Sequence, residues 1–236
     1  MGIEAQLQYV YGVNIGGVLE VTGQLSFYQP ARPDVACVST TSNCLVAWEQ
    51  WYNTGQSSRD IKGRLVHIGD TMANQGDIFP VVAVLGEDVH PAVASMVNGT
   101  SAQFLVVCNT NYNPWTLNLA AFDGSGGIDY GRQGPETNGA GFPAVASNPY
   151  THEYLVVYPS PDGSQMMGLV LTTAFPTSFA SLAFSGGSAP VFPAAAGSEQ
   201  GFLVAAQDRQ AGFTVDDIFG RLWGNRLYLP LAQKKE

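Results

Sequence analysis

The sequence predicts an all-β fold made of repeated antiparallel sheets, and three observations lead to this prediction. The chain has 27 Gly and 14 Pro but only 12% charged residues, a composition typical of many turns and few exposed helices. Apolar runs of strand length, rich in β-branched and aromatic residues, alternate with Asn-Pro, Ser-Pro and Asp-Gly turns, most clearly in residues 141–171. The same series of runs recurs along the chain, so each unit must pack against its copies to bury its faces.

Each repeat begins at a proline that opens its first strand. These prolines are Pro33, Pro91, Pro143 and Pro193, at intervals of 58, 52 and 50 residues. A second run follows 10 to 14 residues after each proline, a third run comes next, and a weaker fourth run lies in the spacer before the next unit. Units of about 50 residues with four short strands predict the blades of a β-propeller.

The N-terminal segment predicts a fifth unit that lacks its first strand. Residues 7–11, 15–19 and 25–28 have the form of the second, third and fourth runs, and residues 229–232 resemble a proline-led first run. The C-terminal strand would then complete the N-terminal blade and close the ring. Five blades is the favoured number, four blades is the alternative, and a β-sandwich is the third candidate. The predicted units of this single domain are residues 1–32, 33–90, 91–142, 143–189 and 190–236.

The repeat also resembles a known group of sequences. Pro-Ala-Val-Ala, a turn, Tyr-Leu-Val-Val with an aromatic residue, and then Asp-Ile-x-Gly-Arg-Leu are similar to the propeller repeats of many secreted or surface-attached bacterial proteins. The match is best at residues 143–158 and 216–222 and good at 33–65. The resemblance implies a propeller fold and an extracellular, cell-surface or periplasmic location, and it implies no catalytic residues.

Charge and hydropathy exclude several classes of partner. The net charge is −9 and the only basic cluster is Lys234-Lys235, so binding to nucleic acid or to an anionic membrane through a basic face is not expected. No run approaches the roughly 18 apolar residues of a membrane helix, and the N-terminus lacks the layout of a signal peptide. We therefore expect no membrane insertion.

The usual catalytic motifs are absent, so the sequence predicts no catalytic residues and no enzymatic activity. His67, His90 and His152 fall in different units and are interpreted as surface or turn residues. Five-bladed glycosidases place a carboxylate pair on their inner strands. Here only Asp34 stands among Ala and Val at those positions, which makes a glycoside-active enzyme the less favoured alternative.

The loops between the second and third strands gather on one face of a propeller, and here they are rich in aromatic residues. Rings beside amides and carboxylates suit a sugar or the hot spot of a protein partner. The predicted function is therefore a non-enzymatic module that binds a carbohydrate or a protein; the alternative is an architectural subunit of a surface assembly, and the oligomeric state is left open. The competing interpretation is that Trp48 and Tyr158 close the core between blades and that Trp51, Tyr52, Tyr112 and Trp115 cover it from above. The candidate ligand residues are Trp48, Trp51, Tyr52, Tyr112, Trp115, Tyr158 and Asp208.

Two further patterns concern cysteines and metals. Cys37 and Cys44 lie at the facing ends of a predicted hairpin, where a disulfide and a pair of buried thiols both remain open; a disulfide would indicate an oxidising compartment. Cys108 lies in an apolar run and is expected to be a free thiol. The loop at residues 123–127, Asp-Gly-Ser-Gly-Gly, supports calcium only weakly, and no other cofactor or metal is predicted.

Overall fold

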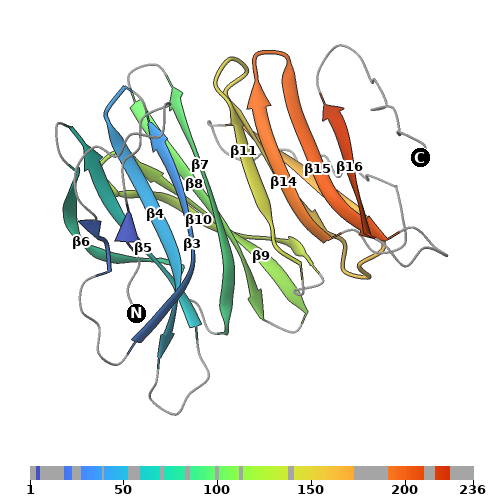
Figure 1. Ribbon diagram of the computed structural model, residues 1–236, viewed down its shortest axis with the longest axis horizontal. Coiled ribbons are helices and arrows are strands. Elements are labelled where there is room, and N and C mark those ends of the chain that lie inside the picture. The colour runs from blue at the N-terminus through green and yellow to red at the C-terminus, as the bar shows by residue number, and fades with distance from the viewer. Residues whose placement is uncertain are drawn as a thin grey trace.

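The computed structural model (Figure 1) contains strands as its only regular elements in the part of the chain that it describes. Within that part, no helix has the length and apolarity that a membrane crossing requires. The described residues are 4–5, 19–22, 28–38, 40–52, 59–69, 72–82, 86–98, 101–111, 114–137, 141–172, 191–209 and 216–223.

Four antiparallel sheets follow one another along the chain, and within each sheet every strand pairs with its neighbour in sequence. The first sheet contains β3 (Tyr28–Val38), β4 (Asn43–Tyr52), β5 (Arg59–Ile68) and β6 (Met72–Val82). The second contains β7 (Asp88–Asn98), β8 (Ser101–Asn111), β9 (Trp115–Asp123) and β10 (Ile128–Glu136). The third contains β11 (Ala144–Asn148), β12 (Glu153–Pro159) and β13 (Met166–Thr172), and the fourth β14 (Val191–Ser198), β15 (Gly201–Arg209) and β16 (Asp216–Trp223). Two short strands, β1 (Glu4–Ala5) and β2 (Leu19–Glu20), form a separate pair.

The sheets pack in a row that follows the chain, from blue to red in Figure 1, and their first strands contact one another in succession: β3 with β7, β7 with β11, and β11 with β14. Successive residues of a strand point to opposite faces, and both faces are apolar here. Phe104 packs between the first and second sheets and its neighbour Leu105 between the second and third. Val156 and Val157 divide in the same way between the two gaps that flank the third sheet. Each sheet therefore depends on its neighbours to remove its apolar surface from water.

The prediction of an all-β fold with four-stranded antiparallel sheets is confirmed by the first two sheets. Three strands are described in each of the other two. The predicted strands at residues 7–11, 179–184 and 229–232 lie outside the described residues. The described sheets form an open row, so the predicted closure into a five-bladed ring is not shown. Val21, next to β2, is fully buried against the outer face of the first sheet.

Three of the repeated prolines, Pro33, Pro91 and Pro193, lie inside their strands, whereas Pro143 directly precedes β11. The pairing shifts by an extra residue between Ala31 and Asp34, and again around Pro91 and Pro193. A β-bulge accommodates a residue that has no N–H to give to the ladder. The residue before each of these three prolines has a positive φ: 48° at Arg32, 57° at His90 and 50° at Phe192. Non-glycine residues rarely adopt this conformation, and it concentrates at functional sites.

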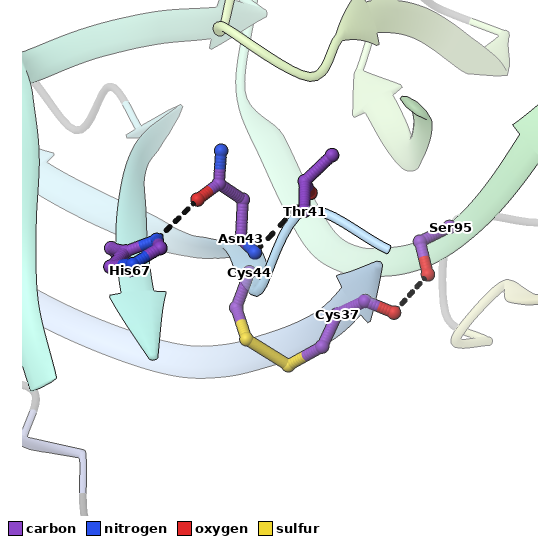
Figure 2. Close-up of a disulfide and its surroundings, with 6 residues drawn as sticks. All are labelled: Cys37, Thr41, Asn43, Cys44, His67 and Ser95. Carbon is purple, nitrogen blue, oxygen red and sulfur yellow. Dashed lines mark hydrogen bonds between the residues drawn. A yellow bond between two sulfur atoms is a disulfide. The ribbon is translucent and has the colours of Figure 1, made fainter. Parts of the chain in front are cut away.

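Cys37 and Cys44 are joined by a disulfide with an S–S distance of 2.08 Å, across the hairpin between β3 and β4 (Figure 2). The two residues are paired directly in the strand register. The Ser95 hydroxyl of β7 donates a hydrogen bond of 2.7 Å to the Cys37 carbonyl. The disulfide therefore lies beside the contact between the first strands of two sheets. Cys108 is a free, fully buried thiol, and burial raises its pKa well above the usual value.

Candidate functional site

One end of the sheets carries the loops in which the sequence analysis placed the candidate ligand residues, and we call it the loop face. At this end β3, β7 and β14 begin while β4, β8 and β12 end, as the pairing of Tyr28 with Tyr52 and of Asp88 with Thr110 requires. The disulfide lies at the opposite end, where Val38 pairs with Asn43.

The aromatic residues predicted on this face have different environments. Trp48 is fully buried, and its indole N–H donates to the Gln50 side-chain oxygen at 3.0 Å. Tyr158 is also buried, in the core between the second and third sheets. Trp51 is 36% exposed and Trp115 is partly buried. Trp48 is therefore a core residue, whereas Trp51 remains accessible.

Three other predicted ligand residues cannot be placed in this way. Tyr112 lies outside the described residues. Tyr52 and Asp208 belong to β4 and β15, but the positions of their side chains are not among those described.

Four residues that precede the repeated prolines converge at the loop face, and we call them the pre-proline cluster: Arg32, His90, Phe142 and Phe192. The His90 and Phe142 rings are stacked with centroids 4.0 Å apart, and the Phe142 and Phe192 centroids are 5.1 Å apart. The Arg32 guanidinium lies 5.5 Å from the Phe142 centroid. The strands β3, β7 and β14 and the segment that leads into β11 thus each contribute one side chain, from the same position of the repeat, to a single site.

Glu49 of β4 binds two members of this cluster, Arg32 and His90. Its side chain is only 1% exposed, and its Oε1 accepts hydrogen bonds from Arg32 Nη1 at 3.0 Å and from the backbone N–H of His90 at 2.8 Å. Its Oε2 lies 3.5 Å from Nη1 of Arg59. A buried carboxylate requires such partners, because desolvation without them is costly. Glu49 therefore connects the first sheet to the start of β7.

Arg59 extends this network outward along the loop face. Its Nη2 lies 3.4 Å from an oxygen of Glu87, whose side chain is 25% exposed, and its guanidinium carbon lies 4.3 Å from the centre of the Trp51 ring. Two carboxyl groups, Glu49 and Glu87, are therefore bound by one guanidinium beside the pre-proline cluster.

Burial lowers the pKa of the His90 imidazole, and the positive charge of Arg32 lowers it further. Glu49 and the Gly141 carbonyl act in the opposite direction, and Arg59 adds to the lowering. The ring is therefore neutral at physiological pH. Among the described residues, its Nδ1 is buried without a hydrogen-bond partner. The sequence analysis interpreted His90 as a surface or turn histidine and did not predict that its ring stacks on Phe142.

Asp34, the carboxylate that the sequence analysis considered for glycoside cleavage, has a structural contact instead. Its Oδ2 accepts a hydrogen bond of 2.7 Å from the backbone N–H of Val93 and so joins β3 to β7. Asn109, at the position of the second sheet that corresponds to Glu49, donates to the Gly141 carbonyl at 2.6 Å. Asn109 thus binds the segment that leads into the third sheet, as Glu49 binds the start of the second sheet, but with a neutral side chain.

No group of three or more metal-ligating side chains is found among the described residues. In the loop that weakly supported calcium, Asp123 Oδ1 accepts hydrogen bonds from the N–H groups of Ser125 and Gly127 and from the Ser125 hydroxyl. These contacts, led by the hydroxyl, lower the pKa of Asp123. This carboxylate stabilises the turn between β9 and β10.

The fold is similar to that of solved propeller-type proteins. No family model matches the sequence, and a comparison with curated protein sequences finds no match. Solved structures are similar at the level of fold. A member of the GH130 family of mannoside phosphorylases, described as containing glycoside hydrolases for β-1,2 mannosidic linkages in Candida mannan, has a TM-score of 0.50 at 9% identity, over 83% of this chain and 67% of that one.

Two further structures have similar scores. A fructofuranosidase from Schwanniomyces occidentalis has a TM-score of 0.53 at 10% identity over 85% of this chain. The sialidase of Trypanosoma rangeli has a TM-score of 0.53 at 10% identity over 96% of this chain. This chain spans 45% and 40% of their lengths.

These similarities contradict the prediction of a non-enzymatic binding or architectural module. That prediction depended on the absence of local catalytic motifs and of a second inner-strand carboxylate. The three similar structures named above are glycoside-active enzymes, and Glu49 and Glu87 come from positions that the motif search did not consider. The signal that could have located the site is the residue before each aligned proline, together with the only acidic residue in the apolar run of β4.

Proposed function

We propose that this protein acts on glycosides at the pre-proline cluster. The observation that carries the proposal is the convergence of two aromatic faces, an arginine and a neutral histidine from four sheets, next to two carboxyl groups that share Arg59. The fold similarity to glycoside-active enzymes supports the same class of reaction.

Phe142 and Phe192 are the surfaces on which a sugar ring would stack. Phe192 is 54% exposed, and an aromatic face binds the C–H side of a sugar while polar neighbours bind its hydroxyls. The Arg32 side chain is 46% exposed and uses Nη1 for Glu49, so its remaining N–H groups are donors for hydroxyl or ring oxygens. Trp51 and Trp115 would extend the binding surface along the loop face.

Glu87 and Glu49 are the proposed carboxyl pair. Glycoside cleavage uses one carboxyl group as the proton donor and a second as nucleophile or base. Glu87 is the accessible member, whereas Glu49 is covered by Arg32. A sugar that draws Arg32 toward its hydroxyls would uncover Oε1 of Glu49. In this assignment Arg59 holds the two groups in position, and Asp34 has no part in the reaction.

The test is cleavage of an oligosaccharide panel that contains mannosides, galactosides, fructosides and sialosides, with and without phosphate, measured as released sugar. Glu87→Gln should abolish release and leave binding intact, because the amide keeps the shape but cannot exchange a proton. Glu153→Gln, on β12 near the opposite end of the third sheet, is the matched control and should keep full activity. If the folded protein releases sugar from no member of the panel, the proposal is wrong.

Binding has its own test. Phe192→Ala should weaken sugar affinity roughly 3- to 10-fold, as expected for a lost aromatic contact. Tyr150→Ala removes a ring that is 62% exposed in the turn between β11 and β12, away from the loop face, and should have no effect. Equal affinities for the two variants would remove Phe192 from the site.

We further propose that the row of sheets closes into a ring of five, in units of residues 1–32, 33–90, 91–142, 143–189 and 190–236. The outer face of the fourth sheet supports this, because Leu203, Ile218 and Leu222 are 41%, 79% and 40% exposed among the described residues and are apolar enough to be covered. Ile218→Asp should cost several kcal/mol if a fifth sheet covers it and almost nothing if the face is open. Val204→Asp, buried against the third sheet, is destabilising in both cases and calibrates the measurement.

The disulfide supports the extracytoplasmic location implied by the repeat resemblance, because such bonds persist in oxidising compartments. Thiol labelling of the protein isolated from its native source tests this: Cys37 and Cys44 should label only after reduction.

A further inference from the structure

A cavity of about 290 Å³ opens on the loop face, between the second and third sheets. One wall comes from the end of β10, with Pro135 and Glu136, and the other from the end of β12 and the start of β13. The lining residues are Pro135, Glu136, Tyr158, Pro161, Met167, Gly168 and Leu169. All but Glu136 and the Tyr158 hydroxyl are apolar groups.

The cavity and the pre-proline cluster lie on the same face and are separated by one packing contact. Tyr158 lines the cavity, and the next residue, Pro159, packs against Gly141 so closely that a Cβ on Gly141 would lie 2.2 Å from the proline ring. Gly141 directly precedes Phe142, whose ring is part of the cluster. A molecule whose sugar lies on Phe142 would reach this cavity by extending over the contact between Gly141 and Pro159.

The size and chemistry of the cavity select one kind of occupant. An apolar cavity of about 150 Å³ is enough to hold benzene, so this one has room for an aryl ring with a substituent. The exposed Glu136 carboxylate at the rim disfavours an anion. Burial raises the pKa of the Tyr158 hydroxyl, so it keeps its proton and can donate to an ether or nitro oxygen of a neutral group.

We propose that this cavity is the binding site for a neutral, apolar aglycone, an aryl or short alkyl group joined to the sugar held by the pre-proline cluster. The inference rests on the proposed action on glycosides and adds the class of substrate. It assigns Tyr158, which the sequence analysis placed among the ligand residues, to the aglycone side of the site.

The experiment compares the affinities of p-nitrophenyl and methyl glycosides of the same sugar, together with free p-nitrophenol, by calorimetry. Burial of the aryl ring should make the p-nitrophenyl glycoside bind about 10- to 50-fold more tightly than the methyl glycoside. Pro161→Trp fills the cavity from one wall and Glu136→Trp fills it from the other, and both residues are exposed. Each variant should remove the difference and leave the methyl glycoside affinity unchanged. Thr151→Trp, at an exposed turn of the third sheet, is the control and should retain the difference.

Each outcome decides between the proposals. Equal affinity for the two glycosides overturns the aglycone site and leaves the action on glycosides standing. A preference for the aryl compound that survives both filling variants overturns the location. Free p-nitrophenol that binds as tightly as its glycosides overturns the link to a sugar, and if no glycoside binds at all, both proposals fail.

Discussion

Gly197 offers the sharpest test of how the sheets pack, because a side chain at this position has no space. The position is the fourth after the repeated proline, where the second and third sheets have Ser95 and Ser147. The Ser95 hydroxyl donates to the Cys37 carbonyl at 2.7 Å and the Ser147 hydroxyl to the Ser95 carbonyl at 2.6 Å. The same contact recurs from sheet to sheet until β14, where glycine replaces serine.

The magnitude follows from the geometry. A Cβ on Gly197 would lie 1.8 Å from the Ser147 carbonyl oxygen and 2.7 Å from its carbonyl carbon, whereas ordinary contacts begin at 3.4 Å. Both obstacles are backbone atoms, so β11 and β14 must separate and loosen the core between the third and fourth sheets. Insertion of one methyl into a packed site costs roughly 1–3 kcal/mol, and more where backbone must move, so we expect Gly197→Ala to cost about 3 kcal/mol.

Thermal unfolding measures this change. For a chain of this length, 1 kcal/mol shifts Tm by about 2–4 °C, so Gly197→Ala should lower Tm by roughly 6 to 12 °C. Gly131→Ala is the matched control, since Gly131 also lies in a strand but has no atom within 4 Å of its added Cβ, and its Tm should stay within about 2 °C of the parent. A Gly197→Ala protein that melts with the control would show that β11 and β14 are not in contact as described.

Three further predictions concern the charged network, pH and the disulfide. Glu49→Gln should cost about 2–4 kcal/mol in urea unfolding, because Arg59 and the half-exposed Arg32 lose their counter-charge; a cost no larger than that of Glu153→Gln would mean that the network adds no stability. Because the pKa of His90 is lowered in the folded protein, the unfolded chain takes up this proton first as pH falls below about 6.5. The free energy of unfolding should therefore decrease with acidification through that range, and His90→Gln should make it less dependent on pH. An unfolding midpoint that rises on acidification would contradict this direction. Replacement of Cys37 and Cys44 by serine should cost about 2 kcal/mol, the loop-closure value for a short loop, and reduction of the parent should lower its Tm equally; a reducing agent without effect on Tm argues against the disulfide.

The sheets were predictable because their cause is local. Alternating faces are encoded in adjacent residues, as Phe104 and Leu105 show by entering different cores, and proline, glycine and asparagine mark the turns between runs. The repeated order of runs then requires copies that pack together, and the observed row of antiparallel sheets confirms this part of the prediction. Strand boundaries were less accurate, because Pro33, Pro91 and Pro193 lie within bulges that the pattern of apolar residues does not reveal.

The candidate site was not predictable in the same way, because its members share a position in the repeat but no residue type that marks a catalytic site. Glu49 is one carboxylate in an apolar strand, and its significance comes from Arg32, Arg59 and the N–H of His90, which approach it from other strands and from the next sheet. Trp48 illustrates the opposite case: its neighbours in sequence fit a binding loop, but its position in the strand register directs it into the core.

The sequence by itself determined that the chain forms repeated antiparallel sheets with apolar faces, since periodicity and turn chemistry act over a few residues. Only the tertiary structure decided that Arg32, His90, Phe142 and Phe192 form one cluster, because residues that are some fifty positions apart meet only when the sheets stack with their first strands in contact. The proposed function depends on that stacking, since a bound sugar would need several side chains at once and no single repeat supplies more than one of these four.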